Sequence, residues 1–87
     1  MIRQEVTITN TTGLHLRPAG IFCKVAGKYQ SKITFEYGSF SANAKSILSV
    51  LGACIKKGDS IVLVCEGEDE EEAMKAMVKA ISDGLGE

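Results

Sequence analysis

The chain holds a single histidine, His15, and a single proline, Pro18. An unperturbed imidazole has a pKa of about 6.5, so much of it is neutral and nucleophilic near neutral pH. Such a ring nitrogen can accept a phosphoryl group and later release it. Arg17 lies between the two residues and supplies a permanent cation whose planar fork matches phosphate oxygens. These residue types, at this spacing, indicate a site that can hold a phosphoryl group on His15.

The residues around His15 indicate where a helix begins. Pro18 has no backbone N–H and is tolerated in the first turn of a helix, so it predicts a helix start at or near His15. The first amides of a helix are unpaired and carry the positive end of its dipole, which favours an anion. Gly13 permits the tight turn that would present His15 there. A lone histidine at a helix start is more often a cap or a surface residue, and the residue types alone leave that alternative open.

The segment from Gly13 to Ala19 reads Gly-Leu-His-Leu-Arg-Pro-Ala and closely resembles the active-site segment of the HPr family. HPr proteins are the histidine-containing phosphocarriers of the bacterial phosphoenolpyruvate-dependent sugar phosphotransferase system. The resemblance implies that His15 is the phosphoacceptor, that Arg17 lies beside the phosphoryl group, and that Pro18 fixes the helix start.

Two more positions bear on the phosphate environment. Thr12 stands where the family often has a small hydrogen-bonding side chain near the phosphate, so the resemblance implies that role here. Leu16 departs from the alanine that is more often found between the histidine and the arginine. We expect this difference to alter the docking surface and to leave the nucleophile unchanged.

Ser46 is the centre of a second informative stretch, at the expected start of a short helix. A serine there commonly caps the free amides, and capping alone would account for it. The resemblance implies a regulatory role, because many Gram-positive bacteria phosphorylate the matching serine with an HPr kinase/phosphorylase. A phosphate would add about −1.5 to −2 charges to this surface. HPr proteins from hosts without that kinase can also carry a serine here, so both interpretations stay open.

An apolar patch is predicted beside the His15 turn. A helix this short cannot turn Ile47, Leu48 and Leu51 all toward the core of the protein if Val50 and Cys54 also face it. Leftover apolar side chains commonly mark partner sites, although residues of the core are the alternative. Glycine inside a helix costs about 1 kcal/mol relative to alanine, and a partner that approaches closely would explain one there. In the HPr family the first two helices form the contact surface, which here implies the docking residues Leu16, Gly20, Ile47, Leu48 and Leu51.

Length and composition predict one globular domain over residues 1–87. Hydrophobic residues make up 45% of the chain and charged residues 24%, as in ordinary soluble domains. The net charge is −1 and the ten basic residues are spread along the chain, so we expect no nucleic-acid binding. No cofactor or metal is expected, because the chain has no Walker loop, nucleotide motif or metal-ligand cluster.

The three cysteines, Cys23, Cys54 and Cys65, are widely spaced and form no Cys-x-x-Cys pair. We therefore expect buried free thiols rather than disulfides or a zinc site, which points weakly to a reducing compartment. The N-terminal residues lack the apolar core of a secretory signal, and no stretch is long enough to span a membrane. A cytoplasmic protein without membrane contact is the expectation.

Hydrophobic periodicity predicts the order strand, helix, strand, strand, helix, strand, helix. Gln4 is the one exception to alternation in the first strand, and Asp69 is expected to cap the last helix. The expected ranges are 2–9, 16–27, 31–37, 40–43, 44–54 and 60–66, with a last helix that follows Asp69 and ends at Gly84. This α+β order suits four strands with the helices on one face. HPr has this architecture, an open-faced sandwich with an antiparallel sheet, and the resemblance covers the whole chain. The order alone also allows a ferredoxin-like sandwich, so the strand order is implied by the resemblance only.

The resemblance implies a phosphocarrier rather than an enzyme. Enzyme I, charged from phosphoenolpyruvate, would donate to His15, and sugar-specific IIA domains would accept from it. Where the host has them, the HPr kinase/phosphorylase and a catabolite-control transcription factor would be further partners of a monomer.

Three alternatives remain. A regulatory interaction module of HPr-like fold would bind a partner without carrying phosphate on histidine, but known paralogues of that kind replace the histidine, which this chain retains. A nitrogen-related phosphotransferase paralogue would differ only in its partners. A ferredoxin-like domain for a small ligand would leave His15 unmodified.

Overall fold

The structure is a computed structural model that describes all 87 residues. Its elements are β1 (Ile2–Thr7), α1 (Leu16–Gly27), β2 (Lys32–Tyr37), β3 (Phe40–Asn43), α2 (Ile47–Gly52), β4 (Ser60–Glu66) and α3 (Glu70–Ser82). The predicted order of strands and helices is confirmed. The prediction of a second helix over 44–54 is too long, because Ser46 caps α2 and Cys54, with a left-handed φ of 54°, lies beyond its end.

The four strands form one sheet in the order β1-β4-β2-β3, and every neighbouring pair is antiparallel. This pairing confirms the open-faced sandwich, which the order of elements alone did not distinguish from a ferredoxin-like one. β4 lies inside the sheet between β1 and β2, as its unbroken apolar run predicts. Its residues Ile61, Leu63 and Cys65 are buried.

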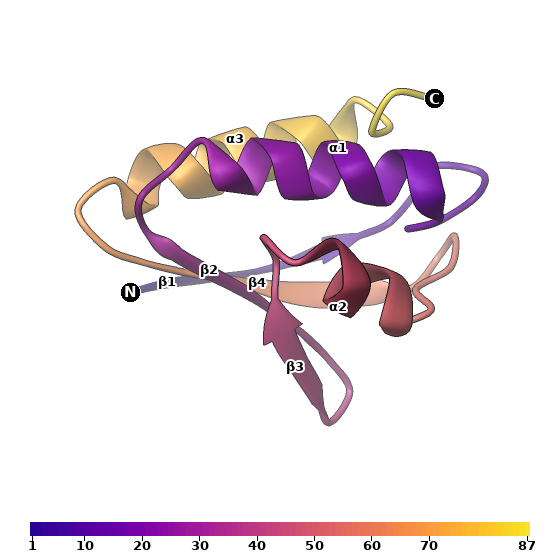
Figure 1. Cartoon of the computed structure of the whole chain (residues 1–87), viewed down its shortest axis with the longest axis horizontal. Coiled ribbons are helices and arrows are strands. Elements are labelled where there is room, and N and C mark those ends of the chain that lie inside the picture. Colours follow the sequence, from indigo (N-terminus) through magenta and orange to yellow (C-terminus); the bar gives the residue numbers. More distant parts are fainter.

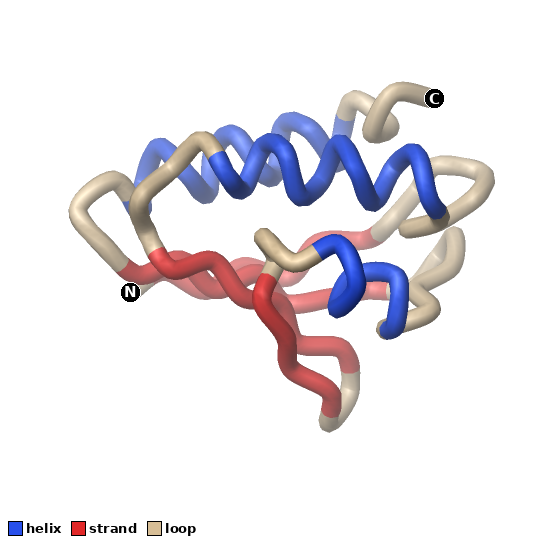
Figure 2. The backbone as a smooth tube through the Cα atoms, in the orientation of Figure 1, coloured by secondary structure: helices blue, strands red, loops and turns tan.

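The two long helices, α1 and α3, lie side by side over one face of the sheet, while α2 packs against α1 and β3 (Figure 1). Figure 2 shows the sheet as a twisted layer beneath them, with no helix on its other face. The core lies between these layers. At its centre Phe22 of α1 meets Phe35 of β2 edge to face, with ring centroids 5.9 Å apart. These layers leave the start of α1 at the molecular surface, where His15 lies exposed.

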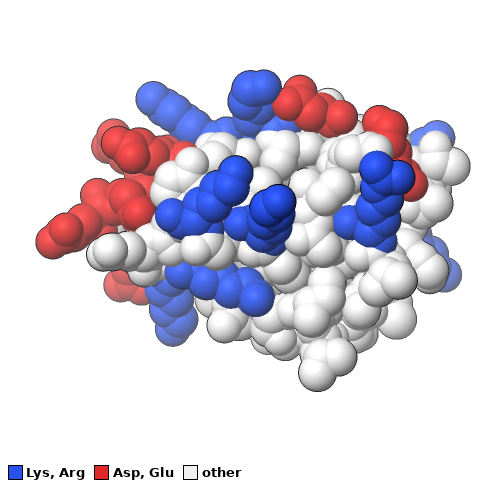
Figure 3. Space-filling view, turned by 45° about the horizontal axis from the view of Figure 1, so that its top comes forward, with Lys and Arg blue, Asp and Glu red and all other residues white.

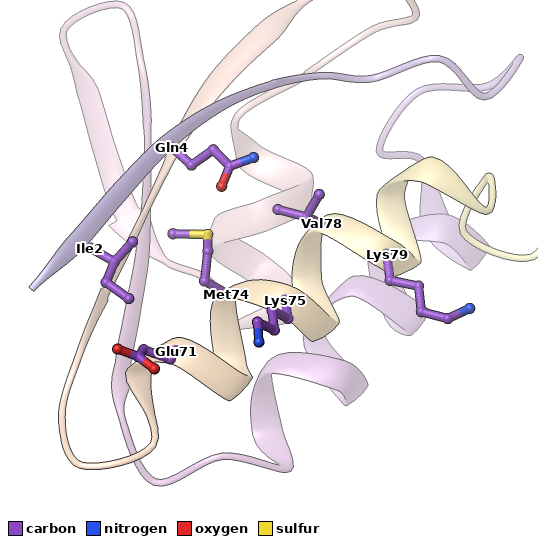
Figure 4. A pocket seen from close by; sticks show the side chains of 7 residues that line it. All are labelled: Ile2, Gln4, Glu71, Met74, Lys75, Val78 and Lys79. Atoms are coloured by element: carbon purple, nitrogen blue, oxygen red, sulfur yellow. The ribbon is translucent and has the colours of Figure 1, made fainter.

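Gln4 faces an open groove between the edge strand β1 and α3, and this position accounts for the break in the apolar alternation of β1. Figure 4 shows Gln4 beside Val78, with Ile2 and Met74 further along the groove. The groove has a volume of about 420 Å³ and charged residues at its rim. Because its outer side is open, a polar side chain there stays hydrated.

The predicted capping role of Asp69 is wrong. Asp69 occupies the N-cap position of α3, but its side chain makes no bond to that helix. Its carboxylate instead accepts hydrogen bonds from the backbone N–H groups of Gln30 and Ser31, both at 2.9 Å, and from the Ser31 hydroxyl. Ser31 is only 2% exposed, so its polar groups need partners inside the protein.

The prediction of three buried cysteines holds for Cys65 only. Cys23 is half-buried and Cys54 is exposed. Burial raises the pKa of the Cys23 and Cys65 thiols. Cys54 lies in the turn after α2 with a left-handed φ of 54°, and the next residue, Ile55, is buried in its place. None of the helices is long and apolar enough to cross a lipid bilayer.

Candidate functional site

The loop that precedes α1 is held in place by the loop after α2. Gly13 has a φ of +64°, and a Cβ there would lie 2.5 Å from the carbonyl oxygen of Ile55 and 2.7 Å from Cα of Lys56. Only glycine both adopts this positive φ without strain and leaves room for the neighbouring backbone. The next residue, Leu14, is 2% exposed and donates its N–H to the Ile55 carbonyl at 3.0 Å. The position of His15 is therefore fixed by contacts with a segment about 40 residues away.

Asn10 closes the turn that leads into this loop. Its Nδ2 donates to the Gly13 carbonyl at 2.6 Å, and the Gly13 N–H donates to the Asn10 carbonyl at 3.1 Å. Asn10 is 6% exposed, which makes it one of the few buried polar residues. The sequence indicated turn chemistry at Asn10 but not this bracing role, because an asparagine in a turn is common.

His15 is the N-cap residue of α1, as the position of Pro18 predicts. Its backbone is extended, with φ −81° and ψ −172°, and its carbonyl accepts the Ala19 N–H at 2.8 Å. The exposed imidazole makes no hydrogen bond to the protein and does not cap the helix. Because Pro18 has no N–H, the amides of Leu16 and Arg17 are the two free donors of the first turn.

His15 and Thr12 open onto one cavity of about 530 Å³. Its other lining residues come from the loop before α1, the end of α2 and the loop after α2: Leu14, Leu51, Cys54, Ile55 and Lys56. The cavity therefore places His15 next to α2, which carries the predicted docking residues. Lys56 adds a cation to this rim, and neither Lys56 nor Cys54 was indicated as a site residue by the sequence.

The side chain of Glu87 occupies the hydrogen-bond donors of Thr12. The Thr12 hydroxyl donates to Glu87 Oε2 at 2.7 Å, and the Thr12 N–H donates to Oε1 at 3.2 Å. The same Oε1 accepts from Asn10 Nδ2 at 3.1 Å. The Thr12 hydroxyl, with help from Asn10 and the Arg17 charge, lowers the pKa of the Glu87 carboxyl. No local pattern indicated this contact, because 75 residues separate Thr12 from Glu87.

Arg17 lies exposed on α1, and its guanidinium makes no hydrogen bond within the protein. Lys24 and the C-cap residue Lys28 follow at spacings of seven and four, so the three cations lie along one exposed side of α1 and its end. Figure 3 shows basic side chains spread over the helical face, with acidic ones gathered at the left end of the molecule and others at its upper right. The face beside His15 is thus suited to an acidic partner.

The predicted docking residues of the first two helices are largely exposed. Leu48 is 79% exposed, Leu16 65% and Ile47 37%, whereas Leu51 is half-buried. Val50 is the one buried residue of α2 and supplies its anchor in the core. The alternative that Ile47 and Leu48 belong to the core is therefore excluded. Gly20 also lies at the surface, with nothing within 4 Å of the position that a Cβ would take.

Ser46 caps α2. Its Oγ accepts the Ser49 N–H at 3.3 Å, and its carbonyl accepts the Val50 N–H at 3.0 Å. The side chain is half-buried and lies directly before the exposed Ile47 and Leu48. A charge on Ser46 would therefore appear at the edge of the apolar surface, while the capping role accounts for the serine by itself.

Comparison with known proteins identifies relatives along most of the chain. A family model described as the phosphorylation site of the PTS HPr component matches residues 2–83. The HPr-like protein Crh of Halalkalibacterium halodurans is 38% identical over 81 residues, which cover 93% of this chain and 96% of that protein. The structure of HPr-C-His from Thermoanaerobacter tengcongensis matches with a TM-score of 0.97 at 41% identity, covering 100% of this chain and 98% of that one.

A further solved structure, Crh of Bacillus subtilis, matches with a TM-score of 0.77 at 31% identity and 97% coverage of both chains. Its description names catabolite repression and a dimer with a swapped domain. Similarity thus extends both to proteins named as HPr and to proteins named as HPr-like Crh.

Proposed function

Since this chain belongs to the HPr family of phosphocarrier proteins, we propose that it accepts a phosphoryl group on His15 from phosphorylated Enzyme I and passes it to sugar-specific IIA domains. One observation carries this proposal. The His15 imidazole is exposed and unbonded at the start of α1, whose first turn has two free amides and carries the exposed, unbonded Arg17.

The chemistry follows from that placement. An imidazole nitrogen of His15 attacks phosphorus, the bond from phosphorus to the donor breaks, and the donor keeps its electron pair. In this proposal Arg17 and the two amides stabilise the phosphoryl oxygens, where negative charge is concentrated during transfer. The second transfer reverses these roles, with His15 as the leaving group. The protein is a relay in this scheme, and its partners supply the phosphoryl donor and acceptor.

The apolar surface of Leu16, Ile47, Leu48 and Leu51, with Gly20, is the proposed docking surface for these partners. It borders the His15 cavity, so a partner seated there brings its own phosphoryl-transfer residue close to the imidazole. Exposed apolar side chains next to a basic helix face combine burial with attraction of an acidic protein.

A regulatory function is a second candidate, supported by the Crh relatives and by the position of Ser46. We propose that an HPr kinase/phosphorylase phosphorylates Ser46 and that the product binds a catabolite-control transcription factor, where the host has both. This function and phosphate transfer through His15 are compatible in one protein. Whether the partners belong to the sugar or the nitrogen-related branch depends on surfaces of those partners. A monomer, the expectation from sequence, stays a prediction because a relative is dimeric.

The decisive experiment is the intact mass of the protein after incubation with phosphoenolpyruvate, magnesium and active Enzyme I. We expect one added phosphoryl group that brief acid treatment removes, because phosphohistidine is acid-labile. His15→Ala should gain none and should keep the far-UV circular dichroism spectrum of the parent, since the side chain is exposed.

An unchanged parent mass, with the same Enzyme I active on a known HPr, would contradict the carrier function and favour the interaction module. An acid-stable phosphoryl group would place the modification on a residue other than histidine. Loss of folding in His15→Ala would show that the residue is structural.

A further inference from the structure

The outer edge of the sheet at β1 has no partner strand. β1 is the first strand in the order β1-β4-β2-β3, and it pairs with β4 only. Just past its end, the Ile8 N–H and the Ile8 carbonyl both bond to the turn that leads into β4, at 2.9 and 2.7 Å. Alternate residues of an antiparallel strand direct their backbone groups to the same side. The N–H and C=O groups of Arg3, Glu5 and Thr7 therefore point outward, as a row of unpaired donors and acceptors.

The groove between β1 and α3 runs along this free edge (Figure 4). Ile2 and Gln4 line it from β1, and Met74 and Val78 line it from α3. Met74 is 4% exposed, while Ile2 and Val78 are half-buried, so apolar surface stays open to solvent along the groove. A strand added beside β1 would place every second side chain on the same face as Ile2 and Gln4. Those side chains would enter the groove.

The charged side chains at the rim of the groove are ordered along its length. Glu71 lies at the Ile2 end, Lys75 in the middle and Lys79 at the far end (Figure 4). Glu71 and Lys75 form no ion pair. Lys79 pairs only with Asp83, and both of those side chains are more than 60% exposed, so the pair is weak. The rim therefore presents two cations to an incoming carboxylate.

We propose that the edge of β1 and this groove bind an extended acidic segment of a partner protein, which adds a fifth strand to the sheet. The backbone of that segment pairs with the outward groups of β1. Its alternate side chains enter the groove: most are apolar, and one is acidic and meets Lys75 and Lys79. An extended backbone is the one ligand that matches a row of strand donors and acceptors over its whole length.

This site lies apart from the surface around His15. β1 and β3 form opposite edges of the sheet, and α2 packs on β3. The groove shares no lining residue with the cavity beside His15. A partner strand on β1 and a partner docked at α1 and α2 can thus be bound at the same time. The inference does not depend on the proposed function.

The first test titrates peptides into the ¹⁵N-labelled full chain. The probes are acetylated, amidated heptapeptides in which Val or Leu alternates with Thr, and one of the apolar positions is replaced by Glu in one series and by Lys in the other. We expect amide chemical-shift changes in β1 and α3, with the Glu series binding at least five-fold more tightly. At saturation, hydrogen exchange of the Arg3, Glu5 and Thr7 amides should slow at least ten-fold. The Gln4 and Val6 amides are the internal controls, because they already bond to β4.

Two substitutions separate the backbone contact from the charge contact. Glu5→Pro removes one outward N–H and no hydrogen bond of the sheet, and edge strands tolerate proline at such a position. It should weaken binding of the Glu series at least ten-fold. Lys75→Glu should reverse the preference between the two series. Lys57→Glu is the matched control, because it makes the same charge change at an exposed residue outside the groove.

A pair of modified peptides tests strand addition without changing the protein. Every second residue of a strand directs its N–H to the same edge, so N-methylation at alternate residues blocks one edge of the peptide only. Of the two alternate patterns, one should abolish binding and the other should leave it within about two-fold of the parent peptide. This comparison holds even where Glu5→Pro fails to fold.

No chemical-shift change in β1 and α3 with any peptide at millimolar concentration would overturn the inference. Equal loss of binding with both methylation patterns would also overturn it, because contact through side chains alone would then explain the binding. Slowed exchange at Arg3, Glu5 and Thr7 that grows with protein concentration, without peptide, would assign the edge to a second copy of this chain and contradict the partner segment. Peptide binding together with failure of Enzyme I to phosphorylate His15 would support this inference and overturn the proposed function.

Discussion

The His15 imidazole makes no hydrogen bond within the protein, because the hydrogen bonds around it are made by the His15 backbone and by other side chains. The cap of α1 is made by the His15 carbonyl and not by its ring, and Asn10 braces the preceding turn through Gly13. Thr12 is engaged by Glu87. The proposed nucleophile, His15, is thus held by its backbone, and its side chain is left unbonded.

At Ser46 the capping role and the regulatory role can be separated by substitution. Asp and Asn both serve as helix N-caps, so Ser46→Asp and Ser46→Asn should both retain α2. Only the first adds a negative charge beside Leu48. We expect Ser46→Asp to take up phosphate from Enzyme I roughly two- to five-fold more slowly than Ser46→Asn, in line with the energy of a partly exposed charge interaction.

Rapid-quench measurement of the phosphoprotein formed over time, with Enzyme I limiting, gives the phosphorylation rates of the two variants. Equal phosphorylation rates for the two variants would contradict a regulatory role of a charge at this surface. A matching loss of helicity in both would show that the cap is disturbed instead.

Among the elements, α1 and α2 each have one face in the core and another at the proposed docking surface. Val50 is the one buried residue of α2 and Leu51 packs half-buried against the core, so Ile47 and Leu48 lie outside. α1 buries Pro18, Ala19, Phe22 and Ala26 and exposes Arg17 and Lys24. Gly20 lies on the exposed side of α1, where the fold does not require a glycine.

Gly20→Ala is therefore expected to raise the free energy of unfolding by about 0.5–1 kcal/mol, because alanine restricts the unfolded chain and fits the open space. If a partner packs closely on this face, the same variant should accept phosphate from Enzyme I more slowly. Urea denaturation and the transfer rate test the two effects. Gly27→Ala is the control, since Gly27 also has open space but lies at the far end of α1.

A slower transfer in Gly20→Ala alone would support close packing of a partner. Equal transfer by both variants and the parent would remove Gly20 from the docking surface. Destabilisation by Gly20→Ala would contradict the open space at this position.

Over the whole molecule, carboxylates tie together segments that are distant in sequence. The Ser31 hydroxyl lowers the pKa of Asp69, and the Arg3 guanidinium lowers that of Glu36. The Lys56 amide and the Tyr37 hydroxyl lower that of Asp59. These pKa values lie below those of the unfolded chain, which are about 4. The contribution of these carboxylates to the free energy of unfolding is therefore complete above that pH, and it is lost as the pH falls through their folded-state pKa values.

We expect the urea midpoint to change little between pH 7 and 5 and to fall between pH 4 and 2. Asp69→Asn should lower the midpoint at pH 7 and reduce the fall in acid, because its amide does not titrate. Glu68→Gln, at an exposed carboxylate nearby, should leave both unchanged. A fall in acid as steep in Asp69→Asn as in the parent would contradict the assigned role of Asp69.

The amino-acid sequence by itself determined the features that depend on neighbouring residues. Alternation and helical spacing located all seven elements, Pro18 located the start of α1, and the residues from Gly13 to Ala19 indicated the phosphoacceptor. These signals are local because backbone sterics, capping and periodicity act within a few residues. Asp69 shows where local reasoning fails: its residue type and position favour a cap, but the buried Ser31 competes for the same carboxylate.

The tertiary structure decided the features that depend on contacts between segments distant in the sequence. These features are the order β1-β4-β2-β3, the exposure of Cys54, the contact of Leu14 with Ile55 beside Gly13, and the contact of Glu87 with Thr12. Each depends on segments that are far apart in the sequence, so no spacing rule predicts it. Burial of the apolar faces selects one arrangement of the layers, and only in that arrangement do these polar groups meet. The proposed phosphoacceptor could thus be recognised in the sequence, whereas the groups that surround it are set by packing.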